Sequence, residues 1–212
     1  FEICEAEAVG LDSLRWQATL DLAESWCQAG EVPAIGLFVA RGTRTTGVHL
    51  FGRQKVDDPH GTIAEDAIFL VASITKPLVA LGALLLVERG ELRLGDRVGR
   101  FVPEFRQKGK NAITIRHLLT HTSGLPDMLP DNRTLREAGA GLEAFVEGTC
   151  QARPDFSPGS GVQYQSMGFA MLGEVIARVS GVDCPTWLRE QLFEPLGLVD
   201  TRLGAPAEWF EG

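Results

Sequence analysis

A serine and a lysine three residues apart are the first residues of this 212-residue chain whose types and spacing suit chemistry. They stand in the segment Ser73-Ile-Thr-Lys76, directly before Pro77. On a helix, residues i and i+3 share one face, so the hydroxyl and the amine would be neighbours. Because a helix interior tolerates proline poorly, the helix is predicted to begin near Ser73. The free N–H groups at a helix N-terminus favour negative charge, which suits a serine nucleophile that passes through an oxyanion.

Apolar residues flank this motif on both sides, at 68–72 and 78–81. Apolar surroundings favour the neutral amine of a lysine, so Lys76 could accept the serine proton near pH 7. The motif taken alone favours a second, structural interpretation. Ser73 would then cap a helix, and Lys76 would be a solvated residue of its first turn.

The only tyrosine of the chain, Tyr164, is the next candidate. It follows a loop rich in Pro, Gly and Ser at 154–161 and precedes an apolar helical pattern from Ser166. Loop ends held by rigid elements are common positions for catalytic groups. A phenol close to an ammonium group loses its proton more easily and can serve as a base. A half-buried structural tyrosine at a helix start is the alternative.

Hydrophobic periodicity predicts the elements that must position these residues. Helices are predicted at 11–27, 73–89, 113–120, 141–150, 166–180 and 186–193, strands at 33–40, 48–52 and 67–71, and a loop at 53–65. The strand at 67–71 is predicted to be buried. Two or three strands do not form a stable sheet alone, so helices must cover them or further strands must follow the chain.

Several motifs in this order resemble the serine β-lactamases and penicillin-binding proteins, particularly the class C branch. Ser73-Ile-Thr-Lys76 resembles their first motif, and Tyr164-Gln-Ser166 resembles their Tyr-x-Asn second motif. The segment from His117 to Pro126 and Pro158-Gly159 also resemble that branch. The likeness extends from about Pro33 to Leu203.

The resemblance implies an α+β fold of the β-lactamase and DD-peptidase type, with an antiparallel sheet flanked by helices beside an all-helical region. Residues 1–72 would supply the first helix and strands, and residues 73–212 the nucleophile helix and helical region, together forming one structural unit. It also implies an acyl-enzyme mechanism. Ser73 would attack a carbonyl carbon, Lys76 and Tyr164 would share the acid and base roles, and Ser166 would contact substrate. Which of the two groups takes the serine proton stays open.

Two departures from the family pattern bear on activity. Ser166 replaces the family's asparagine, and a hydroxyl is shorter and has one donor, which favours ester cleavage over β-lactam or peptide turnover. The third motif, Lys-Thr-Gly or His-x-Gly on a later strand, has no candidate. The chain is therefore expected to be an N-terminal portion that lacks the C-terminal strands, and to have little activity in isolation.

The favoured function is hydrolysis of a small ester or amide, with esterase activity first. A β-lactamase or D-amino-acid peptidase is the second prediction, and a non-catalytic binding member of the family is the third. The expected partner is thus a small ester, amide or β-lactam. The sequence leaves the substrate and the oligomeric state undecided.

Composition narrows the partners further. The net charge of −8 argues against nucleic acid as the main partner. The longest apolar run, 78–87, is about half of the roughly 20 residues that a membrane span needs. The four scattered cysteines lack metal or redox spacing and are expected to be free thiols, which favours a reducing compartment such as the cytoplasm. His117 and His121 lack the glutamate of a zinc motif, so we expect no metal and no cofactor.

Overall fold

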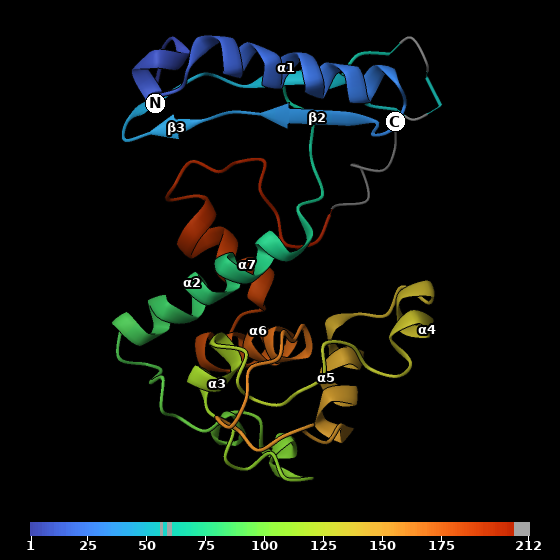
Figure 1. The fold of residues 1–212 in the computed structure, drawn as a ribbon. Coiled ribbons are helices and arrows are strands. Elements are labelled where there is room, and N and C mark those ends of the chain that lie inside the picture. The colour runs from blue at the N-terminus through green and yellow to red at the C-terminus, as the bar shows by residue number, and fades with distance from the viewer. Residues whose placement is uncertain (56, 59–60, 206–212) are drawn as a thin grey trace. The chain divides into compact units, whose positions relative to one another are not determined.

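The computed structural model describes residues 1–55, 57–58 and 61–205 (Figure 1). Backbone contacts divide the chain into two compact units, Phe1–Leu70 and Val71–Gly212. Each unit is described separately. The expected arrangement of residues 1–72 and 73–212 as one structural unit stays a prediction. Of the loop predicted at 53–65, residues 56, 59 and 60 lie outside the described part.

The first unit contains one turn of 3-10 helix at Ala6–Val9, and otherwise one long helix and short strands. They are β1 (Glu2–Ile3), α1 (Ser13–Gln28), β2 (Ala34–Leu37), β3 (Ala40–Arg41), β4 (Arg44–Thr45) and β5 (His49–Gly52). Asp12 caps α1, because its carboxylate accepts the Arg15 N–H at 2.9 Å. The helix lies along the strands in Figure 1 and contacts β2 and β5.

The strands pair mainly in the antiparallel sense. β2 pairs with β5, and β3 forms a hairpin with β4 in which Ala40 lies opposite Thr45. The single strand predicted at 33–40 is interrupted at residues 38 and 39, where the Val39 N–H donates to the Thr46 hydroxyl, 3.1 Å away. β1 joins β4 in parallel, a pairing that the periodicity did not indicate.

The predicted buried strand at 67–71 is wrong. No strand forms at these residues, and four apolar side chains are exposed, with Leu70 98% accessible. Ile68, Phe69 and Val71 are each about half accessible. A strand requires a hydrogen-bonded neighbour, and none of the described strands pairs with this segment. The apolar run therefore wrongly predicted that these side chains would be buried.

Helices dominate the second unit. They are α2 (Thr75–Glu88), α3 (Ile115–Leu119), α4 (Asn132–Glu137), α5 (Leu142–Gln151), α6 (Met167–Ser180) and α7 (Cys184–Leu188), with short turns of 3-10 helix at Ala72–Ile74, Val98–Arg100 and Pro103–Arg106 and a π turn at Arg189–Phe193. The five helical predictions from 73 onward are confirmed. α4 was not predicted, because its six residues are mostly polar and show no apolar period.

The central element of this unit is α6, which contacts α2, α3, α5 and α7 (Figure 1). Its inward face carries Met171, Leu172, Val175 and Ile176, all fully buried. This buried face agrees with the apolar helical pattern predicted from Ser166. Gly181 ends the helix in the left-handed conformation, with φ of 80°, as a glycine can do without a Cβ clash. At the other end of α6, the buried Met167 follows directly after Ser166, so the start of the helix also packs into the core.

The start of α2 differs slightly from the prediction. The helix begins at Thr75, and Ser73 lies in the 3-10 turn directly before it. Pro77 occupies the third helical position, where its missing N–H removes no helical hydrogen bond. Ala72 has φ of 44°, an uncommon conformation for a residue with a Cβ, and it turns the chain immediately before the serine.

No helix in the described part of the chain has the length and apolar character to cross a membrane. All four cysteines lie in that part and are free thiols, as predicted.

A fully buried lysine caps the C-terminal end of α5. The Lys110 ammonium donates to the Cys150 and Ala152 carbonyls, at 2.9 Å and 2.6 Å, and lies 5.4 Å from the ring centre of Phe105. The Cys150 carbonyl lies in the last turn of α5 and the Ala152 carbonyl directly after it, where no helical N–H remains to donate to them. Burial lowers the pKa of Lys110, and the nearby Cys150 opposes this effect.

The Lys110→Met variant is expected to lower the free energy of unfolding by about 2 kcal/mol, because buried carbonyls lose their donors. Urea unfolding followed by circular dichroism measures this change. Lys108→Met is the matched control, since the exposed Lys108 donates to the adjacent Gln151 carbonyl at 2.8 Å. Its effect should stay within about 0.5 kcal/mol. Equal losses from both variants would contradict the role given to Lys110.

Candidate active site

Ser73 and Lys76 are neighbours at the start of α2. The Lys76 Nζ lies 3.1 Å from the Ser73 Oγ, within hydrogen-bond distance. The predicted i, i+3 spacing across the helix start brings the two groups together. Ser73 is exposed and Lys76 is half-buried, so solvent and a small molecule can reach the hydroxyl.

Tyr164 meets the same hydroxyl from a distant part of the sequence. Its phenol donates to the Ser73 Oγ at 2.7 Å, although 91 positions separate the two residues. The Lys76 Nζ lies 4.6 Å from the centre of the Tyr164 ring. A hydroxyl, an amine and a phenol thus form one cluster within the second unit. The arrangement can carry a proton away from the serine oxygen and return it.

The cluster changes the acidity of the phenol. The pKa of Tyr164 lies below its usual value of 10, because of its hydrogen bond with Lys76 first and its hydrogen bond with Ser73 second. The positive charge of Lys76 acts in the same direction, whereas partial burial and Asp127 oppose the shift. Both neighbours can donate to a phenolate, so they favour its charged form. Tyr164 is therefore available as a base at a lower pH than an isolated tyrosine.

The segment that carries Tyr164 is held on both sides. The Gln163 N–H donates to the His121 carbonyl at 2.9 Å, and the Gln165 N–H donates to His121 Nδ1 at 3.2 Å. The Gln165 side chain is fully buried, and its amide nitrogen donates to the Leu118 carbonyl at 3.3 Å. Its amide oxygen accepts from the Ser123 hydroxyl. These contacts attach the segment to the end of α3 and the turn that follows.

Ser166 forms its hydrogen bonds with a carboxylate. Its backbone N–H and its hydroxyl both donate to Asp127 Oδ1, at 2.8 Å and 2.7 Å. A serine hydroxyl has one proton, so this contact leaves only the oxygen lone pairs for another partner. The Ser166 side chain can therefore only accept a hydrogen bond from a further partner. The role of Ser166 in substrate binding stays a prediction.

Sequence reasoning missed three residues that build this site. Asp127 holds Ser166, Gln165 anchors the tyrosine segment, and the His121 ring lies 4.8 Å from the ring of Tyr164. Asp127 follows directly after the His117–Pro126 segment that resembles the family, and that adjacency was a signal for it. His117 does something different from His121: its Nδ1 accepts the Thr114 N–H at 3.2 Å and so caps α3.

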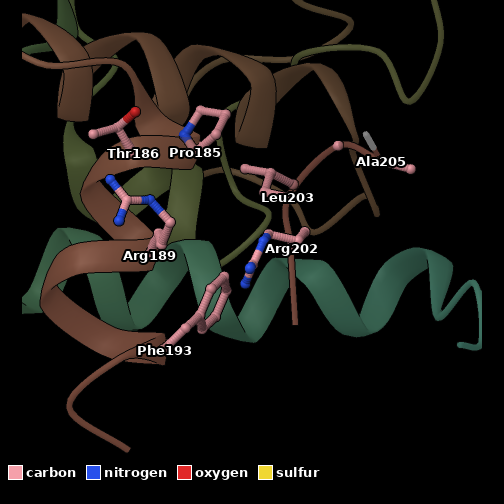
Figure 2. A pocket seen from close by; sticks show the side chains of 8 residues that line it. Pro185, Thr186, Arg189, Phe193, Arg202, Leu203 and Ala205 are labelled. Carbon is pink, nitrogen blue, oxygen red and sulfur yellow. The ribbon is translucent and has the colours of Figure 1, made fainter. Parts of the chain in front are cut away.

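A surface hollow of about 370 Å³ lies elsewhere in the second unit (Figure 2). It is lined by Pro185, Thr186, Arg189, Phe193, Arg202, Leu203, Gly204 and Ala205. Its two arginines are already engaged, because Arg189 pairs with Glu190 and Glu194, and Arg202 donates to backbone carbonyls. None of the lining residues belongs to the serine cluster, so we assign this hollow no role in the chemistry.

Comparison with known proteins identifies the family. The family model described as beta-lactamase matches residues 21–212, and the chain belongs to this family. Its fold is that of the β-lactamases and DD-peptidases, as the resemblance implied. D-amino acid amidase from Ochrobactrum anthropi SV3 has a solved structure that superposes with a TM-score of 0.77 at 25% identity. That match covers 91% of this chain and 54% of the amidase chain.

Two curated relatives are similar in sequence. Esterase EstB of Burkholderia gladioli is 39% identical over 153 residues, which are 64% of this chain and 38% of the esterase. Penicillin-binding protein 4* of Bacillus subtilis strain 168 is 31% identical over 161 residues, which are 73% of this chain and 34% of that protein. The chain thus spans between a third and two fifths of these relatives' length.

Because the chain has a single tyrosine, the effect of the cluster on the acidity of its phenol can be measured without a substrate. Absorbance at the phenolate band during a pH titration reports Tyr164 alone, and its midpoint is expected below 10. The Lys76→Met variant should raise the midpoint toward about 10, because it removes the main group that favours the phenolate. Lys108→Met is the control and should leave the midpoint unchanged. A native midpoint that Lys76→Met does not move would contradict the arrangement.

Proposed function

We propose that this chain carries the nucleophile and the acid–base groups of a serine hydrolase that cleaves a small ester or amide through an acyl-enzyme. One observation supports the proposal above the others: the Ser73 Oγ lies within hydrogen-bond distance of both the Lys76 amine and the Tyr164 phenol. A nucleophilic hydroxyl needs an adjacent base to lose its proton, and here two candidate groups contact it. A serine that only caps a helix would need neither an amine nor a phenol next to its hydroxyl.

Acylation follows from these contacts. The Ser73 oxygen attacks the substrate carbonyl carbon while its proton passes to the phenolate of Tyr164 or to the neutral amine of Lys76. The carbonyl π electrons move to oxygen, and the backbone N–H of Ser73 is proposed as one donor to this oxyanion. When the intermediate collapses, the bond to the leaving group breaks. The alcohol or amine departs with the proton that the base had received.

Deacylation uses the same groups in reverse. A water molecule gives its proton to the base and attacks the acyl carbon. The Ser73 oxygen then leaves and regains a proton, and the acid product is released. In this scheme no metal or cofactor is required, because the proton is returned and no electron is transferred.

Ester cleavage is the favoured activity. The Ser166 hydroxyl donates to Asp127, so it offers a substrate an acceptor where the family's asparagine offers both a donor and an acceptor. An ester bond needs less help than an amide, because its leaving group is a better one. The likeness to esterase EstB supports the same choice.

Hydrolysis of a D-amino-acid amide or a β-lactam is the second candidate. The likeness to a D-amino acid amidase and to a penicillin-binding protein favours it. Turnover of p-nitrophenyl esters without hydrolysis of a chromogenic cephalosporin would favour the esterase. The reverse result would favour the second candidate.

Labelling with a fluorophosphonate tests the nucleophile in the complete gene product. We expect phosphonylation at Ser73, located by peptide mass spectrometry, and no labelling of Ser73→Ala. Tyr164→Phe should react about 10²- to 10⁴-fold more slowly, the range that a general base contributes.

Ser160→Ala is the matched control, because Ser160 is exposed and its hydroxyl donates to the Ser157 carbonyl. It should label like the parent protein. A folded protein that labels at neither Ser73 nor any other residue, and that turns over no ester, would favour a non-catalytic binding role. The isolated 212-residue chain is expected to turn over little ester, since the sequence has no candidate for the family's third motif.

A further inference from the structure

His121 contacts the catalytic tyrosine segment at three points. Its carbonyl accepts from the Gln163 N–H at 2.9 Å, and its ring Nδ1 accepts from the Gln165 N–H at 3.2 Å. Its ring also lies against the Tyr164 ring, with 4.8 Å between centres and 32° between planes. One residue therefore fixes the backbone on both sides of Tyr164 and one face of its phenol.

The backbone of His121 is shaped for this contact. Its φ is 58°, in the left-handed region that residues with a Cβ seldom adopt. Gly124 also lies in that region, with φ of 78°, and a Cβ there would lie 2.3 Å from the Phe156 carbonyl oxygen. The turn from His121 to Gly124 is thus closely packed against the loop that leads to Tyr164. Tertiary contacts hold the histidine in a conformation that local preference does not favour.

The hydrogen bond to Gln165 defines the protonation state of the ring. Nδ1 is an acceptor, so in the neutral ring the proton is on Nε2. An imidazolium has N–H groups on both nitrogens and cannot accept this bond. Protonation of His121 would therefore remove one of the two backbone contacts that flank Tyr164.

The surroundings keep the ring neutral at physiological pH. Burial lowers the pKa of His121 first, and the positive charge of Lys76 on α2 lowers it further. Asp127, in the loop after α3, opposes both effects, and the pKa stays below the usual 6.5. The remaining neighbours are the phenol of Tyr164 and the apolar ring of Phe169 on α6, whose centre lies 5.3 Å away. The neutral form therefore predominates near pH 7, and its loss on acidification has a midpoint below 6.5.

We propose that His121 is a positioning residue for Tyr164: as a neutral imidazole it holds the phenol against Ser73 and Lys76, and its protonation releases the tyrosine segment. This inference rests on the proposed function for its effect on catalysis. Its structural part, the position of the phenol, can be tested without substrate.

Two substitutions separate hydrogen bonding from ring packing. His121→Asn keeps an acceptor close to the place of Nδ1 and tolerates the left-handed backbone, but it has no ring and does not titrate. His121→Phe keeps a ring against Tyr164 and has no acceptor. His117→Asn is the matched control, because His117 lies on the same segment and uses its own Nδ1 to cap α3.

We measure the phenolate titration of Tyr164 in the 212-residue chain, which has a single tyrosine. We measure the ester kinetics in the complete gene product. Both measurements are made on the parent and on these variants. His121→Phe should raise the Tyr164 midpoint toward that of Lys76→Met and lower kcat by about 10- to 10²-fold, the effect of a misplaced group, with KM little changed. His121→Asn and His117→Asn should stay near the parent in both measurements. On acidification below pH 6.5, the ester turnover of His121→Asn should fall less steeply than that of the parent, because its acceptor does not titrate.

Nuclear magnetic resonance of the unsubstituted chain gives a readout that does not depend on a variant folding. The Gln165 backbone amide should shift with pH, with a midpoint below 6.5, as its acceptor is protonated. An amide that does not respond between pH 4 and pH 7 would overturn the inference, as would a parent-like His121→Phe beside an impaired His121→Asn. If the titrations behave as expected while the protein turns over no ester, the positioning of the phenol stands and the proposed function fails.

Discussion

The hydrogen bond between the Tyr164 phenol and the Ser73 hydroxyl is the contact on which the rest of the site depends. Its two residues are 91 positions apart and come from different elements. A base and a nucleophile must stay within hydrogen-bond distance to exchange a proton, so the second unit must hold the start of α2 and the segment before α6 together. The direct packing of α6 on α2 provides this constraint. The hydrophobic core and the chemistry therefore depend on the same pair of helices.

Each partner of this contact is held in a different way. Ser73 and Lys76 are positioned by local geometry, because a helix start puts residues three apart on one side. Tyr164 lies on a segment with no regular structure and relies on hydrogen bonds to the turn after α3. Those bonds involve buried groups, among them the side chain of Gln165, which would be costly to leave without partners. The left-handed conformations of Ala72 and His121 occur at the two places where the chain turns toward the cluster.

The sequence predicted best what depends on short spacing. The stripe of α6 and the pair Ser73 and Lys76 follow from helical periodicity alone. Tyr164 needed the family resemblance, because no local pattern says that residue 164 meets residue 73. The His117–Pro126 segment pointed to the region of Asp127 and His121, but their roles required the structure, since each depends on a turn whose path is set by tertiary packing. The prediction of a buried strand at 67–71 was wrong for a related reason. Apolar residues predict burial, but a strand also requires a hydrogen-bonded neighbouring strand, and a local pattern does not reveal whether one is present.

Membership of the beta-lactamase family and the geometry of the cluster support the central proposal, that Ser73, Lys76 and Tyr164 exchange one proton. A crystal structure of the complete gene product at pH 7 tests it most directly. The account predicts that the Tyr164 oxygen and the Lys76 nitrogen both lie within hydrogen-bond distance of the Ser73 oxygen. Electron density that puts the phenol oxygen more than about 3.5 Å from that hydroxyl, with no water between them, would contradict it.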